Sequence, residues 1–336
     1  NRIYYIAFLS IILFACNEGE KNDKSQVFSD NKAKWIKIEK DLPEKDSLFY
    51  QDDPSPLFRK KLFIDKKIKE AKLYVTSAGY NAVFINDKRV GKNILDPAWT
   101  DYSKRVYYTE YDVIDLLTQE QNVVSVMLGN GFYNPLPLKM WGWLNLRNET
   151  SVGKPKFILK LIISYVDGNK EEIVSDSSWR YSFGPIVRNS VYLGSHYDAR
   201  NEIKGWQSPN FDDSTWKNAQ ISQSPGGVIE KAFFPGVEIT REIEPVNIYE
   251  IDKKKWIVDM GENFTGTYKI KLSGKSGDRV SFRLGERVYD DGSLNPMTAY
   301  ERRLIHTILD KNKFVKTFSE GSGNDRHVVI ARRDEH

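Results

Sequence analysis

The sequence predicts an all-β protein whose first domain is a β-sandwich. From Trp35 to about Ala219, short stretches alternate between apolar and polar residues, as strands do when they bury one face. Gly, Asn and Asp residues interrupt these stretches about every ten residues, the spacing expected of turns. Many short strands joined by close turns are typical of a sandwich.

The strands of this domain are expected in a regular order. The clearest alternating stretches are residues 57–64, 71–78, 81–85, 123–128 and 157–166. Asn86-Asp87 and Asp167-Gly168 each directly follow a strand, and these residue types tolerate the positive φ of a tight hairpin turn. Residues 112–117 predict a short helical turn that is capped by Asp112.

A second β unit is expected from residue 235 onward. Strand-like stretches at 256–260, 268–272 and 279–284 are separated by glycines, and we expect this unit to be incomplete, cut short by the chain end. Beyond residue 298 the alternation stops. No Trp follows Trp256, whereas three of the four His residues do. Residues 299–336 are therefore expected to form an irregular or partly helical tail.

The N-terminus predicts export and lipid anchoring. An apolar run at 3–15 follows Arg2 and ends at Cys16, and it is shorter than the roughly 20 residues of a permanent transmembrane helix. It resembles the lipobox of bacterial lipoprotein signal peptides, which implies cleavage before Cys16, lipidation of Cys16 and a location on a membrane in the periplasm or at the cell surface. A short membrane anchor with an incidental cysteine is the alternative. Residues 16–34 are polar and are expected to be a flexible tether.

Composition argues against a nucleic-acid partner. The 50 Lys and Arg residues nearly balance the 46 Asp and Glu residues, and the sequence has no basic stripe of the kind that binds phosphates. Its 8 Trp, 18 Tyr and 17 Phe residues suit both a β-sandwich core and a protein that stacks on sugars, so composition leaves these two open.

Three groups of motifs follow one another in a specific order. The first comprises residues 71–80, 85–90, 95–102, 107–113 and 128–134. The second comprises residues 176–179, 184–186, 197–200, 205–206 and 211–216. The third comprises residues 259–266, 284–286 and 291–294. In this order and spacing, the motifs resemble the N-terminal region of bacterial α-L-rhamnosidases of glycoside hydrolase family 78, over roughly residues 55–297.

Together with the N-terminal pattern and the composition, the resemblance gives the expected domain organisation. It is a signal peptide at 1–15, a tether at 16–34, a galactose-binding-like β-sandwich (jelly roll) at 35–234, a partial β domain that is concanavalin-like in the family at 235–298, and an atypical tail at 299–336.

The resemblance also implies a function. Complete relatives are expected to hydrolyse terminal α-L-rhamnose by inversion, with water and without an organic cofactor, and we assign no metal ligands in this chain. Glycoside hydrolysis needs two carboxylates that flank the bond, and in this family they lie on a later α/α barrel. No long series of helices is predicted after residue 298, so we assign no catalytic residues and expect this chain alone to be inactive. A stand-alone carbohydrate-binding lipoprotein and an inactive structural remnant are the alternatives.

Sugar contact is expected at Trp141, Trp143 and Tyr133. The two Trp rings flank a glycine in a loop and could form a platform, with Tyr133 shortly before them. Aromatic residues that merely anchor a loop would give the same pattern. Trp206 and Trp216 are expected to pack in the core.

Charged motifs are expected to be structural. Asp198 and Arg200 are two residues apart and so share one side of a strand, which favours an ion pair. The acidic pairs at 52–53, 212–213 and 290–291 lack the alternating ligand spacing of a calcium loop. They are therefore expected to lie in turns.

Overall fold

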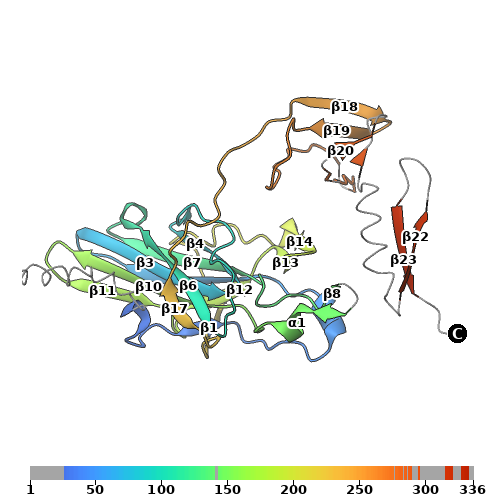
Figure 1. The fold of residues 1–336 in the computed structure, drawn as a ribbon. Coiled ribbons are helices and arrows are strands. Elements are labelled where there is room, and N and C mark those ends of the chain that lie inside the picture. Colours follow the sequence, from blue (N-terminus) through green and yellow to red (C-terminus); the bar gives the residue numbers. More distant parts are fainter. Residues whose placement is uncertain are drawn as a thin grey trace, which may run out of the picture. The chain divides into compact units, whose positions relative to one another are not determined.

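The structure is a computed structural model that describes residues 26–140, 143–275, 277–282, 284–285, 287–289, 294–295, 315–320 and 327–332. The chain divides into two compact units, Asn1–Pro137 with Arg147–Val237 and Leu138–Leu146 with Glu238–His336. The first unit contains a sandwich of two β-sheets, and the second contains two-stranded sheets (Figure 1). The expected all-β fold class is confirmed.

One sheet of the sandwich has seven strands. Six follow the order β16-β1-β10-β3-β6-β17, and β11 also pairs with β10. Their bounds are β1 (Trp35–Lys37), β3 (Ile68–Ala78), β6 (Arg105–Asp112), β10 (Lys156–Tyr165), β11 (Lys170–Val174), β16 (Gln220–Ser222) and β17 (Val228–Lys231). The strands pair antiparallel except for β17, which runs parallel to β6.

The other sheet has six strands in the order β15-β12-β2-β7-β4-β5. Their bounds are β2 (Pro56–Phe63), β4 (Tyr80–Ile85), β5 (Lys88–Arg89), β7 (Gln121–Gly129), β12 (Arg180–Phe183) and β15 (Lys217–Asn218). A separate hairpin joins β13 (Ile186–Ser190) to β14 (Gly194–Tyr197). The helical elements are short: η1 (Gln26–Phe28), η2 (Asp46–Tyr50), η3 (Ile114–Leu116), η4 (Ala199–Asn201) and α1 (Leu146–Glu149).

The predicted hairpins of the sandwich are confirmed. Asn86 and Asp87 have φ values of 49° and 66° and connect β4 to β5. Gly168 has a φ of 89° between β10 and β11. The predicted helical turn is η3, whose start is capped by the Asp112 carboxylate, which accepts a hydrogen bond from Ile114 N.

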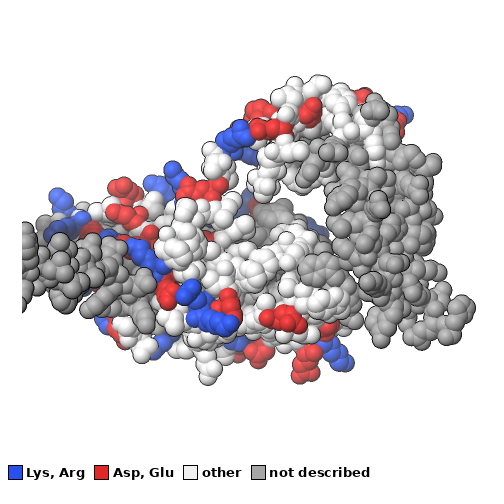
Figure 2. Space-filling model, viewed as in Figure 1, with Lys and Arg blue, Asp and Glu red and all other residues white. Residues whose placement is uncertain are grey.

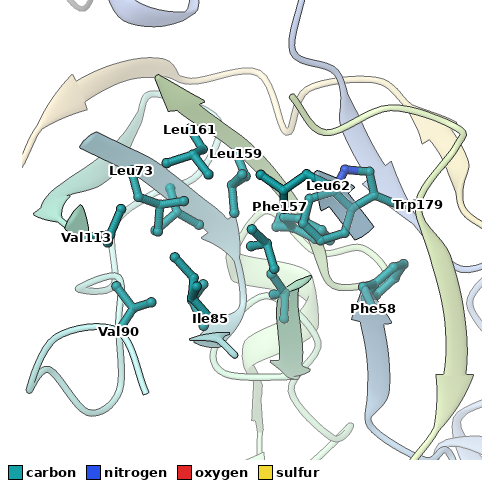
Figure 3. Packing of buried hydrophobic residues seen from close by; sticks show 14 of the residues in the cluster. Phe58, Leu62, Leu73, Ile85, Val90, Val113, Phe157, Leu159, Leu161 and Trp179 are labelled. Atoms are coloured by element: carbon teal, nitrogen blue, oxygen red, sulfur yellow. The ribbon is translucent and has the colours of Figure 1, made fainter. Parts of the chain in front are cut away.

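The core lies between the inner faces of the two sheets. Figure 3 shows side chains from both sheets pointing toward one another. Phe157 of β10 packs edge-on against Phe58 of β2, with ring centroids 5.2 Å apart, and against Trp179, at 5.3 Å. Trp179 is fully buried, and its indole N–H donates to Val174 O. Large apolar side chains fill the space between the two sheets, and the buried indole N–H has the hydrogen-bond partner that it needs.

A buried guanidinium ties the loop before β15 to the second sheet. The side chain of Arg59, in β2, is 0% exposed and lies 2.5 Å from the carboxylate of Asp213. It also donates to the backbone oxygens of Phe211 and Ser208. A buried charge is stable only when it is paired and hydrogen-bonded. The loop must therefore stay in place for the Arg59 side chain to remain buried.

The expected flexible tether ends earlier than residue 34. Phe28 and Ala33 are buried, and Phe28 packs edge-on against Tyr108 of β6. Asp30 forms a 2.7 Å ion pair with Lys160, whose side chain is 3% exposed. These contacts attach residues 26–34 to the sandwich, so the prediction is wrong for them. Cys16 lies outside the described residues.

Among the described residues, the second unit contains four pairs of antiparallel strands. They are β8 (Lys139–Met140) with β9 (Leu144–Asn145), β18 (Asn247–Asp252) with β19 (Lys255–Asp259), β20 (Arg287–Val288) with β21 (Leu294–Asn295), and β22 (Val315–Glu320) with β23 (His327–Arg332). The strand predicted at 256–260 corresponds to β19. Residues 268–272 and the described part of 279–284 form no strand.

Pattern and structure disagree at these two segments because their apolar residues are not covered by a second layer. Ile270 and Phe282 are 47% and 43% exposed. Alternation predicts a strand only where one face can be buried. In the tail, β22 and β23 form a hairpin in place of the irregular or partly helical structure expected there, while residues 299–314 lie outside the description.

The surface of the sandwich carries both charge signs. Figure 2 shows basic and acidic side chains interspersed on the visible face, and many form ion pairs, such as Lys231 with Glu110 at 2.6 Å. In the part of the chain that the structure describes, no helix has the length and apolar character needed to cross a bilayer.

Asp213→Ala should destabilise the sandwich by about 3 kcal/mol, because the Arg59 guanidinium would stay buried without its counter-charge. Urea unfolding of the full chain, followed by Trp fluorescence, measures the loss. Asp212→Ala is the matched control: Asp212 is exposed and its carboxylate accepts a turn hydrogen bond from Ser214 N, whose loss should cost about 1 kcal/mol or less. Equal losses in both variants would contradict a dominant role for the buried pair.

Candidate functional site

A cluster of three aromatic rings, here called the aromatic platform, lies on the sandwich, where the partly buried Phe132 contacts two exposed rings. Trp99 stacks on Phe132 with ring centroids 4.5 Å apart and an interplanar angle of 26°. Tyr192 contacts Phe132 edge-on at 6.2 Å. Trp99 and Tyr192 are 48% and 47% exposed. Three segments that are distant in the sequence therefore present flat apolar area to solvent at one place.

The loop that carries Trp99 is held by Asp96. The backbone oxygen of Asp96 accepts a hydrogen bond from Asn81 N at 2.7 Å. Its buried carboxylate accepts hydrogen bonds from Asn93, Thr109 and Tyr111. Burial raises the pKa of Asp96, although these hydrogen bonds act in the opposite direction. The position of the loop thus depends on a carboxyl group whose ionised form is disfavoured by burial.

A pair of asparagines locks together the segments that carry Phe132 and Tyr192. Asn130 N donates to the side-chain oxygen of Asn189 at 2.7 Å, and the Asn130 amide donates to Asn189 O at 3.0 Å. Asn130 begins the turn after β7, and Asn189 lies in β13. The turn and the β13–β14 hairpin are therefore fixed to each other.

A hollow of about 240 Å³, lined by both polar and apolar side chains, adjoins the same two segments. Asn130 and Asn134 line it from the turn, and Arg188 lines it from β13. Its other walls include Gln51, Asp52, Asp53, Lys40, Leu48 and Phe49. The hollow thus combines carboxylates, amides and cations with apolar side chains, which also include Pro43 and Leu136.

Ion pairs and hydrogen bonds hold the residues that line the hollow in place. Asp53 lies 2.5 Å from the ammonium of Lys154, whose side chain is 4% exposed, and 2.9 Å from that of Lys40. Burial acts to raise the pKa of Asp53, but the hydrogen bonds from Lys154 and Lys40 outweigh it and lower that pKa. The Asn134 amide donates to the Asn130 side chain and accepts from Arg147.

A model of one protein family matches most of this sandwich. Its description is alpha-L-rhamnosidase N-terminal domain, and it covers residues 66–241. The chain belongs to this family.

Individual α-L-rhamnosidases support the assignment. The chain is 32% identical over 276 residues to an alpha-L-rhamnosidase of Formosa agariphila, which covers 77% of this chain and 29% of the relative. The solved alpha-L-rhamnosidase of Dictyoglumus thermophilum is 37% identical with a TM-score of 0.64, over 79% of this chain and 29% of that one. The Streptomyces avermitilis enzyme, solved with L-rhamnose, is 30% identical with a TM-score of 0.66, over 72% and 23%. The chain thus spans less than a third of these relatives.

The C-terminal part is similar to a different group. A model of the R-3-H domain matches residues 279–332. The RNA-binding protein KhpB of Clostridium symbiosum is 49% identical over 43 residues, which is 13% of this chain and 19% of that protein. The match covers the region where the sandwich-like alternation stops.

The residues predicted to contact sugar differ in their exposure to solvent. Tyr133 is 4% exposed and packs edge-on against Tyr102 at 5.1 Å, so its ring faces the interior. Trp143, between β8 and β9, is 74% exposed. Trp141 lies outside the described residues. Trp216 is buried against Phe211, which agrees with core packing.

The charged motifs form ion pairs of two kinds, one on the surface and one with a buried partner. Asp198 and Arg200 form the expected ion pair at 2.6 Å, on the surface. Asp53 is more than a turn residue, because it pairs with the buried Lys154, and residues 290–291 lie outside the description. Among the residues that are described, no three His, Cys, Asp or Glu side chains form a group that could hold a metal ion.

Sequence reasoning missed Trp99 and Phe132 as a site. Both lie in motifs that carry the rhamnosidase resemblance, at 95–102 and 128–134, but they are 33 residues apart. The aromatic residues that the sequence places close together are those at 141 and 143, and Tyr133 directly after Phe132. The one signal that could have found Trp99 and Phe132 is that each lies in a loop that follows a strand, where binding residues concentrate.

Asp96→Asn should stabilise the sandwich at pH 7. A raised folded-state pKa means that Asp96 contributes stability below its unfolded-state pKa, and this contribution is lost as pH rises through the folded-state pKa. The amide cannot ionise, and the hydroxyls of Thr109 and Tyr111 can accept as well as donate. Melting temperatures of both proteins, measured from pH 7 down to below about 4, should show a gap that closes on acidification. A variant that is less stable at every pH would contradict this.

Proposed function

We propose that this chain is the carbohydrate-associated N-terminal region of an α-L-rhamnosidase and that its sandwich binds glycans with terminal α-L-rhamnose. Family membership supports the first part, and the named activity of the relatives supports the choice of sugar. One of the similar structures was solved with L-rhamnose. The observation that carries the proposal is the exposed ring of Trp99, which stacks on the partly buried ring of Phe132.

The platform suits a sugar for a physical reason. A pyranose ring has an apolar face of C–H groups and a rim of hydroxyls. Stacking this face on Trp99, which is 48% exposed, would remove apolar area of both partners from water. Tyr192 limits the platform on one side, and its hydroxyl can donate or accept a hydrogen bond at the rim. A rigid aromatic surface loses little conformational entropy on binding.

The catalytic step is proposed to belong to residues that are not among these 336. The matched family is the N-terminal domain, and the relatives are more than three times as long as the matching part. Two facing carboxylates would be needed for hydrolysis. A stand-alone carbohydrate-binding lipoprotein would bind equally well, whereas an inactive structural remnant would bind no glycan.

Trp99→Ala should weaken binding of a rhamnose-terminated glycan by at least about tenfold, since it removes the larger ring of the stack. Isothermal titration calorimetry of the full chain measures this, and the same preparation should release no rhamnose from an aryl α-L-rhamnoside. Trp256→Ala is the matched control, because Trp256 is 56% exposed in the other unit. Trp143→Ala tests the alternative platform. Loss of binding in Trp143→Ala and not in Trp99→Ala would overturn the proposed site, and absence of binding in the unaltered chain would overturn the function.

A second candidate function concerns the C-terminal part alone. We propose that residues 279–332 bind RNA, because they match the second domain model and resemble a protein named as RNA-binding. The expectation of no nucleic-acid partner relied on the charge balance of the whole chain. Residues 299–336 hold five Arg and three Lys against six acidic residues. The charge balance of the whole chain does not show such a local excess of basic residues. Electrostatic contact with phosphates needs only a local cluster.

Deletion of residues 299–336 should abolish binding of single-stranded RNA at low salt and leave glycan binding unchanged. Fluorescence anisotropy with a labelled oligonucleotide measures the first, and affinity should fall steeply with added salt because bound counterions are released. Trp99→Ala is the reciprocal control and should bind RNA normally. RNA binding that survives the deletion, or is absent from the full chain, would refute this second function.

A further inference from the structure

The hollow and the aromatic platform share their supporting segments. The turn after β7 carries Asn130 and Asn134 to the hollow and Phe132 to the platform. The β13–β14 hairpin carries Arg188 to the hollow, and Tyr192 at its tip contributes to the platform. The bonds between Asn130 and Asn189 fix these two segments to each other. The platform and the hollow are therefore built on the same two segments, which are fixed to each other.

The charges around the hollow largely cancel, which favours a neutral ligand. Asp53 is neutralised by Lys40 and Lys154. Asp41, which also lines the hollow, pairs with Lys37 at 2.9 Å. Arg188 donates to Tyr50 O, so part of its hydrogen-bonding capacity is used within the protein. The hollow is lined by three carboxylates, Asp41, Asp52 and Asp53, and by two cations, Lys40 and Arg188, so an anionic ligand would gain little.

The groups that face solvent are suited to hydroxyls. Asp52 and Gln51 are exposed on the wall of the hollow, and among the described residues Asp52 forms no ion pair. A carboxylate accepts hydrogen bonds from hydroxyl groups, and an amide both donates and accepts. Phe49 adds an aromatic wall and is held under the guanidinium of Arg147, 3.9 Å from its ring.

The size of the hollow limits the ligand. Its volume of about 240 Å³ is below the roughly 300–1,000 Å³ of sites for drug-sized ligands. It suits one sugar residue rather than an extended chain. Its wall at Asp53 is already held by the buried Lys154, so binding would require no ordering of that side chain.

We propose that the hollow is a second sugar subsite, which binds the neutral sugar residue next to the one that stacks on the platform. This inference rests on the proposed glycan-binding function and extends it. The domain would then recognise a disaccharide unit, with terminal rhamnose at Trp99 and its neighbour at Asp52 and Gln51.

Calorimetric titration of the full chain with L-rhamnose, with rutinose and with an α-L-rhamnosyl-rhamnose disaccharide tests the proposal. At least one disaccharide should bind about tenfold more tightly than rhamnose. Asp52→Ala and Gln51→Ala should each reduce this gain to about threefold or less without changing the affinity for rhamnose. Both residues are exposed, so neither change should affect folding, which the melting temperature checks. Asp65→Ala, at an exposed acid outside the hollow, should keep the full gain.

Two results would overturn the subsite while leaving the proposed function intact. One is rhamnose binding at Trp99 with no gain for either disaccharide. The other is a gain that neither Asp52→Ala nor Gln51→Ala reduces. Absence of binding to all three sugars would instead overturn the glycan-binding function itself, and the subsite with it.

Discussion

The sandwich depends on its two sheets covering each other's apolar inner faces. Phe58 of one sheet and Phe157 of the other meet edge-on and are both fully buried. The burial of apolar area is the main favourable contribution to folding, and here it comes from residues that are far apart in the sequence. Each loop at the ends of the strands takes its position from this core.

The second unit shows what happens without such a second layer. In the hairpin of β18 and β19, Ile248 lies opposite Val258, and these side chains are 59% and 49% exposed. Two-stranded sheets are marginal in water because they bury little apolar area. The same alternation that makes strands in the sandwich therefore yields only isolated pairs among the described residues of this unit.

Polar groups decide where the loops of the sandwich lie. The buried Arg59 fixes the loop before β15 through the Asp213 carboxylate and two backbone oxygens. Asp96 fixes the loop that carries Trp99, and Asn130 with Asn189 joins two further segments. Each of these groups is costly when it is buried without partners. Consequently the loop positions are well defined, and aromatic rings from three segments can meet.

The sequence by itself determined the fold class, most strands of the sandwich, the hairpins after Ile85 and Val166, and the family resemblance. These features depend on local alternation, on turn residues and on the order of motifs. It did not determine that residues 26–34 pack on the sandwich, that residues 268–272 form no strand, or that β22 and β23 pair. Those outcomes depend on whether a partner surface exists. The sequence did not predict the aromatic platform for the same reason. Trp99, Phe132 and Tyr192 share no pattern along the chain, and only the packing of the two sheets brings their rings together.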